Sequence, residues 1–193
     1  MIQKKRVVIF ASGSGSNAEQ LCRKFKFHKS IEVVAVFTNN PQAGVIDRVS
    51  KYHIPIYLFS RIEFRDSDVV ANELLKLKAD FIVLAGFLWL IPQKLIHLFP
   101  ERIINIHPAL LPKYGGKGMY GMNVHHAVIQ AKEEKSGITI HLVNDEYDKG
   151  RILFQAEIQI APQDTPGTLA EKIHALEYEN FSTVIERYIT SYH

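Results

Sequence analysis

Residues 6–17 read RVVIFASGSGSN, an apolar run followed at once by a loop with two glycines and three serines. The run Arg6–Phe10 predicts a buried strand, and Ser16–Phe27 has the apolar spacing of a helix. A glycine-rich turn between a strand and a helix is typical of α/β proteins, where it brings the backbone close to a ligand. This stretch therefore predicts an α/β fold with a binding site after the first strand.

The loop between this strand and helix suits an anion. Glycines allow a tight turn, and the first amides of a helix point outward without an acceptor inside it. Ser16 and Glu19 also have the spacing of a capping box, so a well-capped tight turn is the alternative interpretation. We predict a cradle for one phosphate group, formed by Gly13, Ser14, Gly15, Ser16 and Asn17.

A dinucleotide site is a second possibility for the same loop, because Gly13, Gly15 and Ala18 fit the pattern G-x-G-x-x-A. That site also requires an acidic residue at the end of the second strand, to hold a ribose. The second predicted strand ends in Thr38-Asn39-Asn40, which contains no acid. A single phosphate is therefore the better ligand.

Apolar runs alternate with helical patterns along most of the chain. The predicted strands are Arg6–Phe10, Ile31–Phe37, Ile54–Leu58, Phe81–Ala85, Ile103–His107, Ile138–Val143 and Ile152–Ile160. The predicted helices are Ser16–Phe27, Gly44–Tyr52, Asp66–Lys78, Pro92–Phe99, Asn123–Lys132, and a last one capped by Asp164 or Thr168 that runs to about Tyr188. We predict an α/β, Rossmann-like domain: a mostly parallel twisted sheet, helices on both faces and a late antiparallel strand pair.

Length and composition fit one domain over residues 1–193, with a phosphate-binding half of about 1–100 and a catalytic and folate-binding half of about 101–193. The net charge of +3 and the absence of long basic runs argue against a nucleic-acid platform. Cys22 is the only cysteine, so no internal disulfide is expected. Apolar runs are too short for a signal peptide or a membrane span, and we expect a cytoplasmic protein without a membrane partner.

Two polar residues close the fifth predicted strand. Asn105 and His107 are two apart and share one face, while Ile104 and Ile106 face the other way. Polar side chains at the carboxyl end of a buried strand need partners or a function. A histidine satisfied by structural contacts is the alternative, but its pairing with Asn105 favours a functional site.

The loop between the last two strands, Val143–Gly150, carries several carboxylates, among them Asp148. A solvated hairpin loop and a divalent cation site are both possible for such a loop. The glycine and glutamate of the EF-hand pattern are missing from the required positions. His125 and His126 are adjacent and point apart, and no H-E-x-x-H occurs, so we expect no metal.

Four stretches together resemble the phosphoribosylglycinamide formyltransferase family, over nearly the whole chain. They are Ser12–Asn17, Ala85-Gly86-Phe87, the run Asn105-Ile106-His107-Pro108-Ala109-Leu110-Leu111-Pro112, and Ser136–Gly150 with His141 and Asp148. The pattern N-x-H-P-x-L-L-P is specific for formyl-transferring folate enzymes. The resemblance implies formyl transfer from 10-formyltetrahydrofolate, a co-substrate, to 5'-phosphoribosylglycinamide in purine (IMP) synthesis. It implies small-molecule substrates, and a monomer or homodimer.

The resemblance also implies roles for individual residues. Asn105, His107 and Asp148 match the catalytic residues, and the loop Gly13–Asn17 matches the phosphate cradle. The substrate contacts implied are Gly86, Ile106, Pro108 and Glu177. The folate contacts implied are Leu88, Trp89, Leu90, Ile91, Leu142, Val143, Asn144 and Asp145.

Glu177 also stands out without the resemblance. It lies on an apolar helix stripe with Ile173, Phe181, Val184 and Tyr188, where a carboxylate is costly unless it binds something. A snorkelling residue at the edge of the stripe is the alternative.

The chain departs from the family in three places. Trp89 lies where many relatives carry a cation, which leaves open how the folate glutamate tail is held. The glycine-rich loop Tyr114–Asn123 looks longer than in many relatives, and Lys149 replaces a frequently small residue. The four glycines of the loop Tyr114–Asn123 make this loop a candidate lid.

Other functions remain open within and outside this chemistry. A methionyl-tRNA formyltransferase or a formyltetrahydrofolate hydrolase usually carries a further domain, for which 193 residues leave little room. A sugar-nucleotide formyltransferase is also possible, but the predicted phosphate loop Gly13–Asn17 argues against it. The presence of Asn105, His107 and Asp148 together argues against a binding module without turnover.

Overall fold

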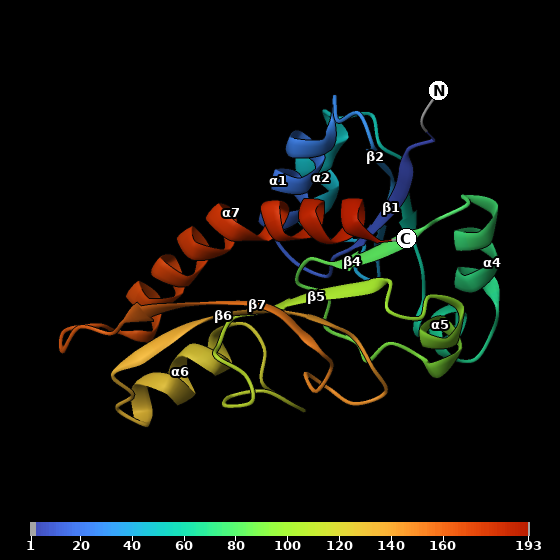
Figure 1. The fold of residues 1–193 in the computed structure, drawn as a ribbon. Coiled ribbons are helices and arrows are strands. Elements are labelled where there is room, and N and C mark those ends of the chain that lie inside the picture. Colours follow the sequence, from blue (N-terminus) through green and yellow to red (C-terminus); the bar gives the residue numbers. More distant parts are fainter. Residues whose placement is uncertain (1–2, 193) are drawn as a thin grey trace.

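The computed structural model describes residues 3–192 and contains one seven-stranded sheet (Figure 1). In spatial order the strands are β3 (Ile56–Leu58), β2 (Ile31–Thr38), β1 (Lys5–Phe10), β4 (Phe81–Leu84), β5 (Ile103–His107), β6 (Lys135–Leu142) and β7 (Ile152–Gln159). Neighbours from β3 to β5 pair in parallel, and β6 is antiparallel to both β5 and β7. The predicted fold class is confirmed.

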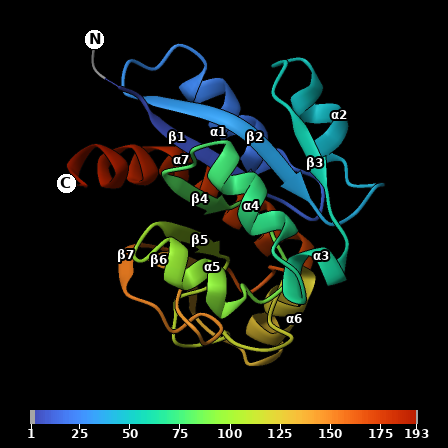
Figure 2. The ribbon, with the colours of Figure 1, turned by 90° about the vertical axis from the view of Figure 1, so that its right-hand side faces the viewer.

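Helices cover both faces of the sheet, and Figure 2 shows α4 and α5 in front of it with α7 behind. One face packs against α1 (Ser16–Phe25), α2 (Val45–Ser50), α6 (Met122–Gln130) and α7 (Pro166–Ser191). The other packs against α3 (Arg61–Arg65), α4 (Val69–Lys76) and α5 (Gln93–Leu98). Alternate residues of β1 enter the two cores, Val7 and Ile9 on the α7 side and Val8 and Phe10 on the α4 side.

The strand order reverses between β1 and β4, because β1 is followed along the chain by β2 on one side while β4 lies on the other. The loops that leave these two strands meet there, since the Ser12 amide donates to the Gly86 carbonyl at 3.1 Å. Such a switch point is where open α/β sheets place their ligands. The topology therefore favours a binding site at the carboxyl ends of β1, β4 and β5.

Two helix predictions need correction. The single helix expected over Asp66–Lys78 is preceded by a separate short helix, α3, that the prediction omitted. Ser60 and Glu63 form a reciprocal capping box at its start, and this spacing was the missed signal. The last helix is capped by Thr165, neither by Asp164 nor by Thr168, because Pro166 suits the first helical position.

The expected capping box of α1 is also wrong. Gly15 is its N-cap in the left-handed region, with φ 77°, and no side chain caps the helix. Glu19 turns instead toward α2, where it pairs with Arg48 at 3.1 Å and with Lys51. The first amides of α1 therefore keep no side-chain acceptor at this end, which leaves them to a ligand.

Candidate functional site

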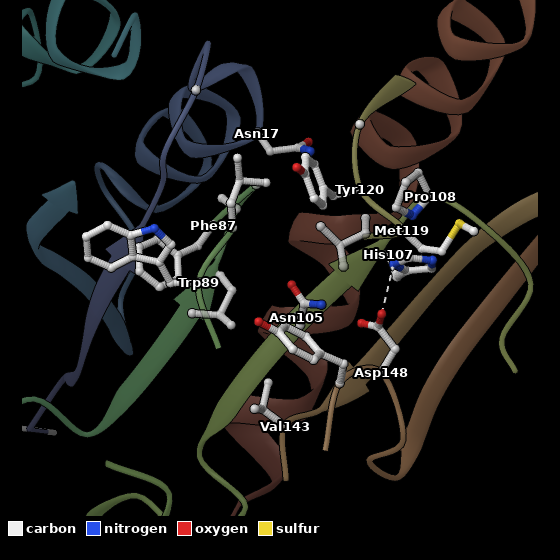
Figure 3. Close-up of a pocket in the computed structure, with 18 of the residues that line it drawn as sticks. Asn17, Phe87, Trp89, Asn105, His107, Pro108, Met119, Tyr120, Val143 and Asp148 are labelled. Carbon is white, nitrogen blue, oxygen red and sulfur yellow. Dashed lines mark ion pairs between the residues drawn. The ribbon is translucent and has the colours of Figure 1, made fainter. Parts of the chain in front are cut away.

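A cavity of about 590 Å³ lies across the carboxyl ends of β1, β4 and β5. Its volume is within the usual range for small-ligand sites. Figure 3 shows Asn17 and Val143 on opposite sides of Asn105, with Phe87 and Trp89 along another wall. The cavity therefore has two ends and a polar centre.

The loop Gly13–Asn17 forms one end and is held by α2. The Val45 amide donates to the Gly13 carbonyl at 3.1 Å. A Cβ atom on Gly15 would lie 2.4 Å from Val45 Cα, and its φ of 77° is unfavourable for other residues. Glycine is therefore required at this position both by backbone conformation and by space.

Ser12 joins this loop to the segment after β4. Its amide donates to the Gly86 carbonyl, and its Oγ accepts from the Leu88 amide at 3.1 Å. Ser12 is 7% exposed, so both bonds are shielded from water. The phosphate loop and the Leu88–Ile91 wall are thus held in one relative position.

Asn105 lies at the centre, facing a histidine on the neighbouring strand. The antiparallel pairing of β5 with β6 sets Asn105 opposite His141, and Asn105 Nδ2 is 3.1 Å from His141 Nε2. The His141 Nδ1–H donates to the Leu142 carbonyl at 2.9 Å, which leaves Nε2 to accept from the amide. This arrangement fixes the orientation of the Asn105 side chain.

Asp148 bridges two histidines. Its Oδ2 lies 3.6 Å from His107 Nδ1, the contact drawn as a dashed line in Figure 3, and its Oδ1 lies 3.5 Å from His141 Nε2. The Gly116 amide donates to Oδ2 at 2.8 Å. The carboxylate is thus placed between the centre of the cavity and the glycine-rich loop.

Burial and charge act in opposite directions on this pair. Burial lowers the pKa of His107 below its ordinary value, although the Asp148 carboxylate, the Tyr114 carbonyl and other charges partly offset it. Burial alone would raise the pKa of Asp148, but contacts from His141, His107 and the Gly116 amide together lower it. At neutral pH the pair therefore holds a neutral imidazole beside an ionised carboxylate.

The second nitrogen of His107 is also engaged. Its Nε2–H donates to the Tyr114 carbonyl at 2.8 Å, at the start of the glycine-rich loop. Thr139, which is fully buried, holds the turn before that loop: it donates to the Ala109 carbonyl and accepts from the Leu111 amide. Both His107 and Asp148 are therefore tied to backbone groups of the same loop.

Glu177 is 5% exposed and lies beside the phosphate loop. Its Oε2 accepts from Asn17 Nδ2 at 2.9 Å and lies 3.1 Å from His174 Nδ1. The apolar stripe predicted around it is observed for Ile173 and Phe181, and it continues through Ile185 and Ile189. Glu177 thus faces the cavity and is not a snorkelling edge residue.

Most of the predicted site residues line this one cavity. They are the phosphate loop Gly13, Ser14, Gly15, Ser16 and Asn17, the central residues Asn105, His107 and Asp148, the substrate candidates Gly86, Ile106, Pro108 and Glu177, and the folate candidates Leu88, Trp89, Leu90, Ile91 and Val143. Leu142, Asn144 and Asp145 are not among its lining residues. Leu142 packs in the core, and the Asn144 side chain accepts from the Glu146 amide.

Several lining residues were not predicted from the sequence. His141 faces Asn105 only because of the β5–β6 register, and His125 and His174 reach the cavity from two helices. Lys117, Met119 and Tyr120 line it from the glycine-rich loop. His141 lies within the stretch Ser136–Gly150 that carries the family resemblance, and this was a signal that could have marked it as a site residue.

Within residues 3–192, no group of three or more histidine, cysteine, aspartate or glutamate side chains is arranged to hold a metal ion. Nor does any helix in that part of the chain have the length and apolar character to cross a membrane.

Comparison with known proteins finds relatives that match most of the chain. The formyl transferase family matches residues 5–185. The phosphoribosylglycinamide formyltransferase of Bacillus subtilis is 32% identical over 95% of this chain and 94% of its own length. The crystal structure of that enzyme from Bacillus halodurans superimposes with a TM-score of 0.87 at 34% identity, covering 97% of this chain and 96% of the other.

Plant relatives are also similar but longer. The chloroplastic phosphoribosylglycinamide formyltransferase of Arabidopsis thaliana is 39% identical over 95% of this chain. This chain spans 65% of the length of that protein and 61% of the Vigna unguiculata relative. The matches over most of the chain identify it as a member of the formyl transferase family, among the phosphoribosylglycinamide formyltransferases.

Proposed function

We propose that the protein transfers a formyl group from 10-formyltetrahydrofolate to the amine of 5'-phosphoribosylglycinamide, a step of purine (IMP) synthesis. One observation carries the proposal: Asn105, His107 and Asp148 lie at the centre of a single cavity that has the glycine-rich loop Gly13–Asn17, at the uncapped start of α1, at one end. The family membership and the names of its relatives support the same reaction.

The acceptor lies with its phosphate against the amides of the loop Gly13–Asn17, where the helix dipole of α1 favours an anion. Its ribose then faces Glu177, a carboxylate that can accept from hydroxyl groups. Gly86, Ile106 and Pro108 border the path from there to Asn105. This orientation brings the glycinamide amine to the centre of the cavity.

The formyl donor occupies the opposite end. Leu88, Trp89, Leu90 and Ile91, with Val143, supply an apolar wall for the folate ring. Trp89 packs against Phe59, Phe64 and Phe87 with ring centroids 5.8 to 6.2 Å apart, so it belongs to an aromatic cluster. Trp89 therefore offers the folate an apolar surface, at the position where a cation in many relatives would bind the carboxylate of the folate glutamate tail.

The chemical step needs no further cofactor, because the formyl group is already electrophilic. The amine nitrogen forms a bond to the formyl carbon, and the bond from that carbon to N10 of the folate breaks. The amine loses a proton and N10 gains one. The Asn105 amide donates to the formyl oxygen as negative charge builds there, a contribution of about 3 kcal/mol for one preorganised donor.

Asp148 accepts the proton of the attacking amine, directly or through a water molecule. Its lowered pKa keeps it ionised at neutral pH, and the Gly116 amide donates a hydrogen bond to the carboxylate. His107 takes up a proton only when a charge in the cavity offsets the cost of its burial. Donation by His107 to the formyl oxygen requires the Tyr114 carbonyl to release its Nε2, which couples the glycine-rich loop to the reaction.

We propose small-molecule substrates, the cytoplasm as the location, and a monomer or homodimer as the assembly. The mild net charge of +3 suits anionic metabolites better than a nucleic acid. The strands β1–β4 supply the phosphate loop and the Leu88–Ile91 wall, and β5–β7 with their loops supply the central residues. The two halves of one domain thus bind the two ends of the acceptor.

An absorbance assay with purified protein tests the reaction. The protein is mixed with 10-formyl-5,8-dideazafolate and glycinamide ribonucleotide, and the deformylated folate is followed. We expect turnover that depends on the ribonucleotide. Deformylation without any acceptor would assign the protein to hydrolysis instead, and no turnover with both ligands bound would refute the acceptor.

A further inference from the structure

A series of hydrogen bonds links the centre of the cavity to a residue outside it. The His107 Nε2–H donates to the Tyr114 carbonyl at 2.8 Å, and the Tyr114 hydroxyl donates to Glu133 Oε1 at 2.9 Å. Glu133 lies between α6 and β6 and also accepts from Lys113 Nζ at 2.8 Å. Tyr114 thus contacts His107 through its backbone and Glu133 through its side chain.

The segment that begins at Tyr114 also contacts Asp148. Two residues further on, the Gly116 amide donates to Asp148 Oδ2 at 2.8 Å. A Cβ atom on Gly115 would lie 3.2 Å from Asp148 Cβ, so the backbone packs closely against this side chain. A displacement of Tyr114 would therefore move the backbone groups that hold both His107 and Asp148.

The backbone at the two ends of this contact is strained. Tyr114 and Asp148 have φ values of 56° and 55°, in the left-handed region that residues other than glycine rarely adopt. Such conformations persist where surrounding contacts over-determine them. The Tyr114 ring packs against the hydrophobic core, and Glu133 holds the hydroxyl at the end of that ring. The anchored side chain thus helps to keep Tyr114 in its strained conformation.

The proton of the His107 ring has two possible positions. Burial lowers the pKa of His107, so the ring is neutral at neutral pH and carries one proton. Asp148 Oδ2, 3.6 Å from Nδ1, attracts that proton to Nδ1, whereas the Tyr114 carbonyl, 2.8 Å from Nε2, holds it on Nε2. In the proposed reaction Nε2 donates to the formyl oxygen, so the Tyr114 carbonyl keeps the proton on the nitrogen that uses it.

We propose that Glu133 is a positioning residue for formyl transfer, which anchors the Tyr114 hydroxyl and thereby keeps the proton of neutral His107 on Nε2. The inference rests on the proposed function and deepens it. Neither Tyr114 nor Glu133 is among the described residues that line the cavity. Both lie instead along a second hollow, of about 550 Å³, together with Lys113. Glu133 therefore acts through Tyr114 and touches no substrate.

The charge of Glu133 strengthens this anchor. Hydrogen bonds from Lys113 and from Tyr114 hold the pKa of the Glu133 carboxyl below its ordinary value, so it is ionised at neutral pH. A hydrogen bond to a carboxylate is stronger than one between neutral groups. The Lys113 side chain is 67% exposed, so water screens its ion pair with Glu133. The hydrogen bond from Tyr114 should therefore matter more to the reaction than the ion pair.

Kinetic measurements at neutral pH test the anchor. Glu133→Ala and Tyr114→Phe each remove it, and kcat should fall roughly tenfold while KM for both substrates stays within about twofold. The double variant should lose no more than either single one, because both changes remove the same bond. Glu133→Gln keeps an oxygen acceptor and should hold kcat within about threefold of the wild type. Glu134→Ala, a change at the exposed neighbour, is the matched control and should follow the wild type.

Nitrogen NMR of the imidazole rings reads the position of the His107 proton directly. The signals of His107 are assigned by their absence from the spectrum of His107→Gln. The wild type and Glu133→Gln should carry the proton on Nε2, and in Glu133→Ala it should move at least in part to Nδ1. A fall in kcat with an unchanged proton position would mean that Glu133 supports only the fold. A moved proton with unchanged kcat would equally overturn the assignment.

The NMR experiment does not depend on turnover, so it separates this inference from the proposed reaction. If the wild type forms no product and the His107 proton still moves in Glu133→Ala, the reaction is wrong and the hold of Glu133 on His107 stands. If Glu133→Ala keeps both the kcat and the proton position of the wild type, Glu133 is not a positioning residue.

Discussion

The phosphate end of the cavity is held by backbone packing, whereas its centre is held by contacts between ionisable side chains. At the phosphate end, Gly15 has a conformation and a contact with Val45 that exclude any side chain. At the centre, the Asp148 carboxylate lies 3.6 Å from His107 Nδ1 and 3.5 Å from His141 Nε2. The phosphate end and the centre therefore depend on different physical terms.

This difference separates binding from chemistry. A cradle of amides has a constant charge, so its affinity depends on whether the backbone keeps its shape. A carboxylate beside a buried histidine, as in the Asp148–His107 pair, changes charge with pH and with any ligand that enters. Substitutions at the two regions should accordingly alter different measurements, stability and substrate affinity at one end, and turnover at the other.

The largest effect is expected from Asp148→Asn, which keeps the shape of the side chain and removes its charge. Without a carboxylate to accept the proton of the amine, kcat should fall roughly 10³-fold. Binding of ribose 5-phosphate should not change, because the phosphate loop does not contact Asp148. Near-normal turnover would remove Asp148 from the mechanism, and Asp47→Asn, an exposed change on α2, is the matched control.

The second effect is on stability and comes from Gly15→Ala. The new Cβ meets the Val45 backbone at 2.4 Å while the residue keeps a positive φ. The free energy of unfolding should fall by about 2–4 kcal/mol. Urea denaturation measures this, with Gly13→Ala as control, since a Cβ at Gly13 meets nothing within 4 Å and should change stability by about 0.5 kcal/mol or less. Equal losses in both variants would show that the loop is not locked by Val45.

The two regions also differ in how far the sequence predicts them. The phosphate end is local, because a strand, a glycine-rich turn and a helix follow one another along the chain, and all five predicted residues line the cavity. Asn105 and His107 were likewise predicted from a single strand. The helix cap was not, since Gly15 takes the position that the Ser16–Glu19 spacing suggested for Ser16.

The centre depends on contacts between segments that are distant in sequence. His141 meets Asn105 because of the register between β5 and β6, which no local pattern specifies. The Gly116 amide and the Tyr114 carbonyl reach the centre through a loop of irregular shape. Leu142, Asn144 and Asp145 lie at the end of β6 and in the hairpin after it, and they are not among the residues that line the cavity.

A third test uses pH and stability to examine the centre. Burial lowers the pKa of His107, so the unfolded chain takes up this proton more readily than the folded one. Stability from this group is therefore present above the ordinary histidine pKa of about 6.5 and is lost as the pH falls below it. The unfolding temperature of the wild type should decrease from about pH 7 to about pH 5 more steeply than that of His107→Gln. Parallel curves would mean that His107 is not held in its neutral form.

The smallest effect concerns Ser12, which connects the phosphate end of the cavity to the apolar wall Leu88–Ile91 at the opposite end. Ser12→Ala removes the acceptor for the Leu88 amide and keeps the bond from the Ser12 amide to Gly86. The lost hydrogen bond corresponds to about 1 kcal/mol, or roughly a fivefold change in an equilibrium. Because Leu88 belongs to the apolar wall, KM for the formyl folate should rise by about that factor, with KM for the ribonucleotide unchanged. If both KM values rise together, Ser12 supports the phosphate loop itself, and the two ends of the cavity are less independent than their construction suggests.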